Sequence, residues 1–117
     1  MTSLPAMNLP RVSVLVPAKD EAENLPEFMR QAAEVFASEP GKYEVVVVDD
    51  GSTDETATVL AELEERYPFL RSVRHRTRRG IADALRTGYV HSRGDVLVFY
   101  PADLQFKPED IPKLVGS

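Results

Sequence analysis

The chain has 117 residues and a formal net charge of −5, so it has the size of one domain and no overall nucleic-acid-binding character. Its composition, 43% hydrophobic and 28% charged, is typical of a folded globular domain and argues against wholesale disorder. The sequence has no cysteine, which excludes disulfides and thiolate chemistry, and its longest apolar runs are far shorter than the about 20 residues of a membrane span.

The apolar pattern predicts strands that alternate with helices, after a flexible leader over residues 1–10. Strands are expected at 12–16, where Pro17 ends the first one, and at 43–48, 69–75 and 96–100. Helices are expected at 24–38, 52–67 and 81–92, with a short last one after PADLQF. Two S/N-x-x-E capping boxes are predicted, Asn24 with Glu27 and Ser52 with Glu55.

This alternation predicts an α/β fold, a three-layer α/β/α sandwich around a mostly parallel, Rossmann-like sheet. Right-handed crossovers give the expected strand order 3-2-1-4. Because KLVGS ends the chain shortly after a helix begins, we expect the domain of residues 11–117 to be truncated at its C-terminus.

The stretch VVVVDDGSTDET places Asp49 and Asp50 at the tip of a buried strand, on opposite faces. Gly51 allows a tight turn with positive φ, and the polar residues after it are expected to cap the next helix. Two other loops that follow strands, PAKDE and PADLQ, also carry carboxylates. Because parallel strands end at one edge, these acids predict a site for sugar hydroxyls, nucleobase N–H groups or a divalent cation.

The segments VSVLVPAKDEAENLPEF, VVVVDDGSTDET and GIADALRTGYVHSRGDVLVFYPADLQFKPEDIP resemble the nucleotide-sugar-binding half of a family 2 glycosyltransferase. The branch they are most similar to contains the polyprenyl-phosphate (dolichol-phosphate) mannose and glucose synthases, and the match covers residues 11–115. The resemblance implies the N-terminal part of a glycosyltransferase A-type fold. It also implies an enzyme that transfers a sugar from a nucleotide-diphospho-sugar donor, with inversion, to an acceptor such as a polyprenyl phosphate.

The resemblance implies roles for individual residues. The donor would be bound by eight of them: Pro17, Ala18, Glu21, Asp49, Asp50, Gly80, Arg86 and Asp103. Asp103 and Gln105 would hold Mg²⁺ or Mn²⁺ at the end of a D-A-D-L-Q motif, offsetting charge on the departing nucleoside diphosphate. Asp20 stands where the usual P-x-x-N-E motif has Asn.

Two departures from the family pattern stand out. Pro101 replaces the usual first Asp of D-A-D and weakens the expected metal site, although Mg²⁺ often uses only one or two carboxylates plus phosphates. RHRTRRG, residues 74–80, replaces an Asn-Gly-type loop, and its four arginines either face a diphosphate or form a solvated basic loop. His75 and His91 have no partner pattern and are interpreted as structural.

The general base of the transfer is expected beyond residue 117, so this chain alone is expected to be inactive. We expect a cytoplasmic protein, at the cytoplasmic face of the membrane in its full-length form, with self-association through an exposed sheet edge. Asp50 and Asp103 are expected to stay hydrated in the empty site, so that their loss affects binding more than folding. The alternative is a non-catalytic module with a nucleotide-sugar-like fold, which Pro101 and the early end of the chain favour. A nicotinamide-binding domain is not expected, because no G-x-G-x-x-G follows the first strand.

Overall fold

The computed structural model describes residues 9–102 and 108–114 of the chain. Its strands are β1 (Val12–Ala18), β2 (Tyr43–Asp50), β3 (Leu70–His75) and β4 (Val96–Phe99). Its helices are α2 (Leu25–Phe36), α3 (Thr56–Arg66), α4 (Ile81–His91), the 3₁₀ turn η1 (Pro108–Asp110) and α5 (Ile111–Leu114). No helix within the described ranges is long and apolar enough to cross a membrane.

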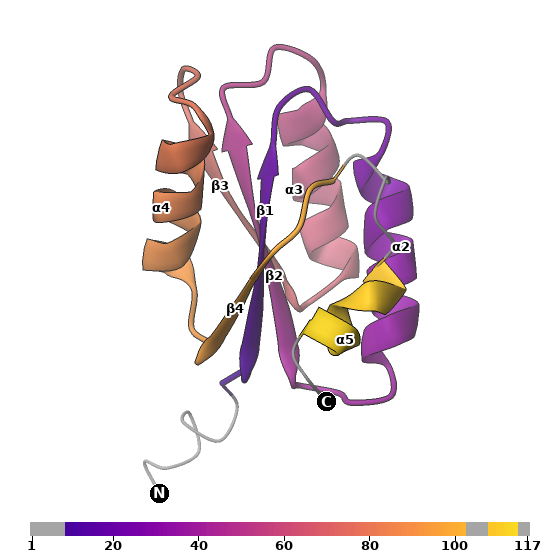
Figure 1. The fold of residues 1–117 in the computed structure, drawn as a ribbon. Coiled ribbons are helices and arrows are strands. Elements are labelled where there is room, and N and C mark those ends of the chain that lie inside the picture. Colours follow the sequence, from indigo (N-terminus) through magenta and orange to yellow (C-terminus); the bar gives the residue numbers. More distant parts are fainter. Residues whose placement is uncertain (1–8, 103–107, 115–117) are drawn as a thin grey trace, which may run out of the picture.

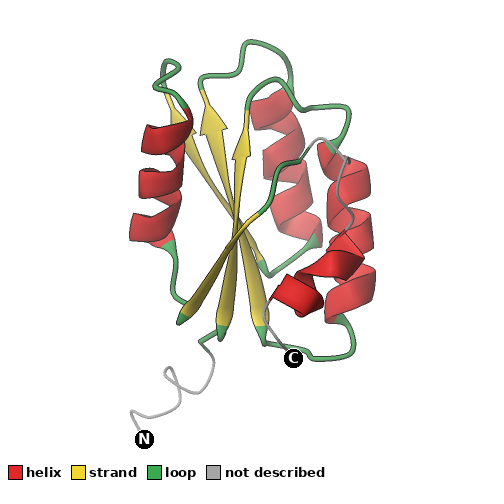
Figure 2. Cartoon of the chain, in the orientation of Figure 1, coloured by secondary structure: helices red, strands yellow, loops and turns green. Residues whose placement is uncertain are grey.

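The sheet has four parallel strands in the order β3-β2-β1-β4, which confirms the predicted order 3-2-1-4. Figure 1 shows α4 on one face of this sheet and α2, α3 and α5 on the other, so the predicted three-layer α/β/α arrangement is confirmed. The loops that leave β1, β2 and β3 all lie at the edge where the strand arrows point, as Figure 2 shows.

The two central strands are buried over almost their whole length. On one face, Val45 and Val47 pack in a single cluster with Phe28 and Met29 of α2 and Leu60 of α3. On the other face α4 packs against the sheet at Gly88. A Cβ there would lie 3.4–3.5 Å from the side chains of Leu15 and Val48.

The first strand is longer than predicted, because Pro17 lies inside β1 and pairs with Val48. The prediction that Pro17 ends the strand was wrong, for a topological reason. β4 pairs with β1 only as far as Leu15, so beyond that residue β1 has a neighbour on one side only. Proline lacks a backbone donor and is tolerated where one side of a strand is unpaired. β2 likewise continues past its predicted end to include Asp50.

The capping box predicted for α2 is not formed. Asn24 has a helical backbone conformation, and its side chain makes no cap hydrogen bond. Its amide instead donates to Glu21 Oε1 at 2.8 Å. Glu27 accepts hydrogen bonds from Arg30 and Gln31 on the exposed side of the helix. Local side-chain partners therefore replace the reciprocal cap.

The prediction of a second capping box is also wrong, because the serine contacts another loop. The residue before α3 is Glu55, and it makes no side-chain cap bond. Ser52 Oγ accepts a hydrogen bond from the backbone N–H of Asp20, 32 residues earlier in the chain. Asp54 supplies the local contact at this end of α3, since its Oδ1 accepts from the N–H of Thr56 at 2.9 Å.

A buried glutamate holds the opposite, amino end of the sheet together. Glu44 is 1% exposed, and its Oε2 accepts hydrogen bonds from Ser13 Oγ (2.6 Å) and from the N–H of Arg93 (2.7 Å). Its Oε1 accepts from Arg93 Nε at 3.0 Å and lies 3.5 Å from Arg71 Nη1. Ser13 Oγ in turn accepts from the N–H of Gly94 at 2.8 Å. Glu44 therefore ties the turn before β4 to the two central strands.

Candidate functional site

A cavity of about 480 Å³ opens at the carboxyl ends of β1 and β2, beside the start of α4. Eight residues line it: Pro17, Ala18, Lys19, Glu21, Asp50, Arg78, Ile81 and Ala84. Four of the predicted donor-binding residues, Pro17, Ala18, Glu21 and Asp50, are therefore brought together in one pocket. In open α/β sheets, ligands bind at this edge, so the position agrees with a binding site.

Asp50 forms part of the pocket wall and is held by three hydrogen bonds. Its Oδ1 accepts from His75 Nδ1 (2.8 Å) and from the N–H of Arg79 (2.9 Å). Its Oδ2 accepts from the N–H of Gly80 at 2.9 Å. A carboxylate has about four acceptor positions, so one position on Oδ2 stays open to a ligand in the pocket.

These bonds keep Asp50 ionised. Burial alone would raise the pKa of its carboxyl, but the hydrogen bonds from His75, Arg79 and Gly80 outweigh burial and lower the pKa. Asp50 is only 5% exposed, so the expectation that it is hydrated in the empty site was wrong. β2 extends two residues further than predicted, and the loop after β3 closes over its tip. Asp50 is therefore both a pocket residue and a structural one.

His75 is the partner that the sequence interpretation missed. It is 4% exposed, and its Nε2 lies 2.8 Å from Thr87 Oγ1 of α4, while its Nδ1 bonds Asp50. Asp50 and His75 are register partners at the ends of adjacent parallel strands. That register was the available signal, since an acid and a histidine that end neighbouring strands are brought side by side. The structural role assigned to His75 is confirmed. His91 Nδ1 contacts the carbonyl of Thr87 on the exposed side of α4.

Gly51 lets the basic loop, defined as residues 76–80, lie directly on the tip of β2. Its φ is +74°, and a Cβ there would be 2.3 Å from the backbone nitrogen of Arg78. This contact explains why glycine follows the two aspartates. Both the backbone conformation and the space exclude a side chain.

We expect Gly51→Ala to destabilise the fold by about 2 kcal/mol, from left-handed backbone strain plus displacement of the basic loop. Gly41 is the matched control, because its φ is +83° and a Cβ there would meet nothing within 4 Å. Gly41→Ala should therefore cost only the backbone term, about 1 kcal/mol. Denaturant unfolding of both variants measures the difference. Equal losses would contradict the packing of the loop on Gly51.

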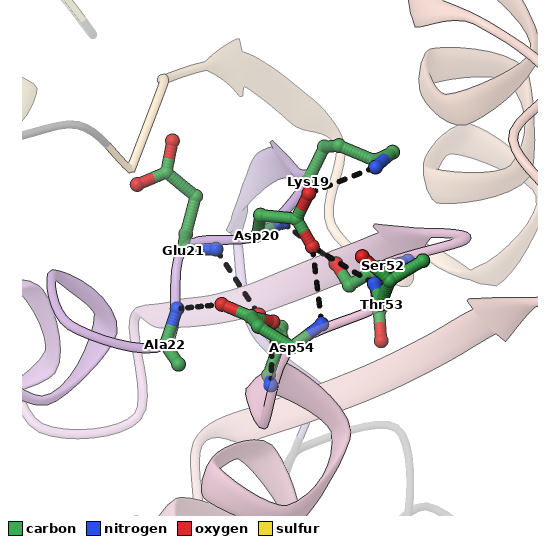
Figure 3. Close-up of polar contacts among 9 residues, drawn as sticks. Lys19, Asp20, Glu21, Ala22, Ser52, Thr53 and Asp54 are labelled. Atoms are coloured by element: carbon green, nitrogen blue, oxygen red, sulfur yellow. Dashed lines mark hydrogen bonds and ion pairs between the residues drawn. The ribbon is translucent and has the colours of Figure 1, made fainter.

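The loops after β1 and β2 are braced by hydrogen bonds between them, as Figure 3 shows. Asp20, with a left-handed φ of 57°, accepts through Oδ1 from the N–H groups of Thr53 (2.8 Å) and Asp54 (3.3 Å). In return its own N–H donates to Ser52 Oγ at 2.8 Å. Aspartate and asparagine share the oxygen acceptor and the tolerance of positive φ. That shared chemistry explains Asp20 at a position where the family motif has Asn.

Asp49 does not line the pocket. It is 1% exposed on the other face of β2, where its Oδ1 accepts from the N–H of Ser52 at 3.1 Å. Its Oδ2 has no hydrogen-bond partner among the described residues, and the nearest cation, Arg74 Nε, is 3.9 Å away. Asp49 therefore does not contact this pocket, and its donor-binding role stays a prediction.

The remaining predicted site residues divide into two groups. Gly80 contributes its backbone N–H to Asp50, while Arg86 is exposed on α4 and pairs with Asp83 at 3.0 Å, away from the pocket lining. Asp103 and Gln105, the predicted metal ligands, lie outside the described residues. Pro101, after β4, offers no side-chain ligand. Within 9–102 and 108–114, no group of three or more histidine or acidic side chains is arranged to hold a metal ion.

A second cavity, of about 420 Å³, lies at the amino end of the sheet. Its wall includes the aromatic side chains of Phe36, Tyr43 and Phe69, and the buried Glu44 that is already fully bonded. The Tyr43 hydroxyl is buried without a hydrogen-bond partner among the described residues. None of the residues singled out from the motifs lines this cavity, so the pocket at the carboxyl end is the candidate site.

Sequence comparison relates the chain to one family of enzymes. The profile described as "Glycosyl transferase family 2" matches residues 13–117. The undecaprenyl-phosphate 4-deoxy-4-formamido-L-arabinose transferase of Sodalis glossinidius (strain morsitans) is 38% identical over 110 residues, which are 93% of this chain and 34% of the relative. Its counterpart from Enterobacter sp. (strain 638) is 38% identical over 118 residues, covering 100% of this chain and 36% of the relative. The chain thus spans about a third of the length of these relatives.

Solved structures agree with this relation. The mannosyltransferase PcManGT from Pyrobaculum calidifontis, in complex with GDP-Man and Mn²⁺, matches with a TM-score of 0.75 and 36% identity. The match covers 87% of this chain and 30% of that one. TarS 1-349 of S. aureus, in complex with UDP-GlcNAc, matches with a TM-score of 0.71 over 90% of this chain and 30% of that one, at 22% identity. The second likeness supports the fold alone.

Proposed function

The chain belongs to glycosyl transferase family 2, and from that premise we propose that it binds a nucleotide-diphospho-sugar as the donor part of a sugar transferase. The observation that carries the proposal is the pocket in which Pro17, Ala18, Glu21 and Asp50 meet at the carboxyl edge of the sheet. The acceptor is proposed to be a polyprenyl phosphate, which the names of the two undecaprenyl-phosphate transferases support.

The pocket suits the polar part of a nucleoside. Glu21 is half-buried, its Oε1 accepts from Asn24, and its backbone N–H is held by Thr56 Oγ1 at 3.0 Å. Asp50 offers its one open acceptor position from a rigid setting. Ionised carboxylates form strong hydrogen bonds with ribose hydroxyls and nucleobase N–H groups. Ala18 and Ala84 are small side chains in the wall that leave room for a flat ring.

A divalent cation is also proposed, on the support of the Mn²⁺ in the mannosyltransferase complex. Asp103 and Gln105 would hold it, and it would stabilise negative charge on the departing nucleoside diphosphate. The described residues add no further carboxylate cluster for this ion, and Pro101 adds no ligand.

We expect the chain to bind UDP or GDP. Glu21→Ala should lower the affinity for the nucleotide by about tenfold, the effect of losing one charge-assisted hydrogen bond. Isothermal titration in the presence of Mn²⁺ measures this. Glu23→Ala is the matched control, because Glu23 is exposed two residues further along and does not line the pocket. Binding of neither nucleotide would contradict the proposal and favour the alternative, a non-catalytic module.

A further inference from the structure

The pocket contains a cation whose charge no described side chain offsets. Lys19 and Arg78 are its two basic wall residues, and Glu21 and Asp50 are its two acidic ones. Lys19 Nζ is paired with Asp20 Oδ2 at 2.9 Å. Asp50 already accepts three hydrogen bonds, from His75 and from two backbone N–H groups. Within the described part of the chain, Arg78 forms no ion pair and no side-chain hydrogen bond.

The backbone that carries Arg78 is held in place although its side chain is exposed. Immediately before it, Thr77 and the Arg78 nitrogen pack against Gly51, where no Cβ could fit. Immediately after it, the N–H groups of Arg79 and Gly80 donate to Asp50. A preorganised backbone lowers the entropy lost when its side chain binds a ligand. Arg78 therefore lines the pocket from a backbone that is held in place.

We propose that Arg78, with Lys19 of the same pocket, binds the diphosphate of a nucleoside diphosphate directly, so that the chain holds this ligand even when the proposed divalent cation is absent. The inference rests on the proposed donor-binding function and concerns the anionic half of the ligand. A guanidinium matches the oxygens of a phosphate with a planar pair of donors, and it stays charged at every physiological pH.

The sequence after β4 gives the proposal its second support. After β4, where the resemblance leads one to expect an aspartate, the chain has Pro101. The segment expected to hold the cation has lost a carboxylate, and the basic loop after β3 carries arginines in place of an Asn-Gly turn. Positive charge supplied by Arg78 compensates for a weakened cation site by simple electrostatics. These two departures are thus explained together.

The test is isothermal titration of the full 117-residue chain with UDP and GDP, in EDTA and in Mg²⁺, with uridine and guanosine as probes that lack the diphosphate. Wild type is expected to bind one nucleoside diphosphate in EDTA. Arg78→Ala should weaken that binding by at least about tenfold, the loss of a charge-assisted hydrogen bond, while the nucleoside alone binds as before. The affinity of Arg78→Lys should lie between those of wild type and Arg78→Ala, because lysine keeps the positive charge and loses the planar pair of guanidinium donors. Arg76→Ala is the matched control, since Arg76 is exposed on the same loop outside the pocket lining.

Three results would overturn the inference, and they separate it from the proposed function. Wild-type binding that vanishes in EDTA and returns with Mg²⁺ would refute direct recognition by Arg78 and leave donor binding intact. Equal affinities of wild type and Arg78→Ala in EDTA would do the same. Absence of nucleotide binding in both buffers would overturn the inference and the donor-binding function together. Unchanged melting temperatures of the variants show that a change in affinity comes from the substituted side chain and not from a loss of folded protein.

Discussion

Glu44→Ala is expected to lower the free energy of unfolding by about 3 kcal/mol, near the lower bound for removing one partner of a buried ion pair. The variant loses the acceptor for Ser13 Oγ and for the N–H and Nε of Arg93, and it leaves a cavity at the amino end of the sheet. The loss stays near that bound because the side chains of Arg71 and Arg93 are 37% and 46% exposed, so water can solvate them when the carboxylate is gone. Thermal or denaturant unfolding measures the effect.

The effect of Glu44 should depend on pH. Burial by itself raises the pKa of its carboxyl, but the hydrogen bonds from Ser13 and Arg93 outweigh burial, and the pKa lies below its usual value of 4.5. The unfolded chain therefore takes up this proton first as the pH falls. The stabilisation by Glu44 is complete above about 4.5 and is lost as the pH falls through the lower folded pKa. The difference in the free energy of unfolding between wild type and Glu44→Ala should therefore become smaller as the pH falls through that range.

Glu65→Ala serves as the control for Glu44→Ala, because Glu65 is exposed on α3. An exposed substitution of this kind is expected to change stability by no more than about 0.5 kcal/mol. If Glu44→Ala behaved like Glu65→Ala, the network at the amino end of the sheet would contribute nothing to the fold. A stability difference that widened as the pH fell would contradict the assignment of the charged, hydrogen-bonded form.

Asp50→Ala is expected to cost about 3 kcal/mol of stability, because it leaves His75 and two backbone N–H groups without their buried acceptor. It should also weaken nucleotide binding, since the basic loop, which places Arg78 in the pocket wall, loses the bonds that hold Arg79 and Gly80. Asp50→Asn keeps the shape and one acceptor oxygen, so it should be less destabilising than alanine. Unfolding curves and nucleotide titrations well below the melting temperature separate the two effects.

Asp95→Ala is the control for Asp50→Ala, because Asp95 is exposed in the turn before β4. A full retention of stability by Asp50→Ala, together with lost binding, would show that Asp50 is a pure ligand contact. The reverse result, with stability lost and binding unchanged in the folded fraction, would remove Asp50 from the site and leave it a structural acid. Loss of both is the outcome that the geometry supports.

Local signals in the sequence were sufficient to predict the layers of the fold and four of the residues that line the pocket. Valine runs bounded by turn residues marked the strands, helical periodicity marked α2, α3 and α4, and crossover handedness led to the observed strand order. Pro17, Ala18, Glu21 and Asp50 met because parallel strands end at a common edge, and this follows from the order of elements alone.

Tertiary structure alone decided which partner each polar side chain took. Ser52 left its expected cap for Asp20, and Glu44 found Ser13 and Arg93, although these partners lie more than 30 residues away in the chain. Asp50 and His75 met through the register of β2 and β3, and Pro17 stayed in its strand because β4 stops pairing at Leu15. A short sequence window contains the backbone preferences of its own residues, whereas a hydrogen bond between strands or loops depends on how whole elements are placed. The physical reason is that buried polar groups must be satisfied by whatever donor or acceptor packing brings near them.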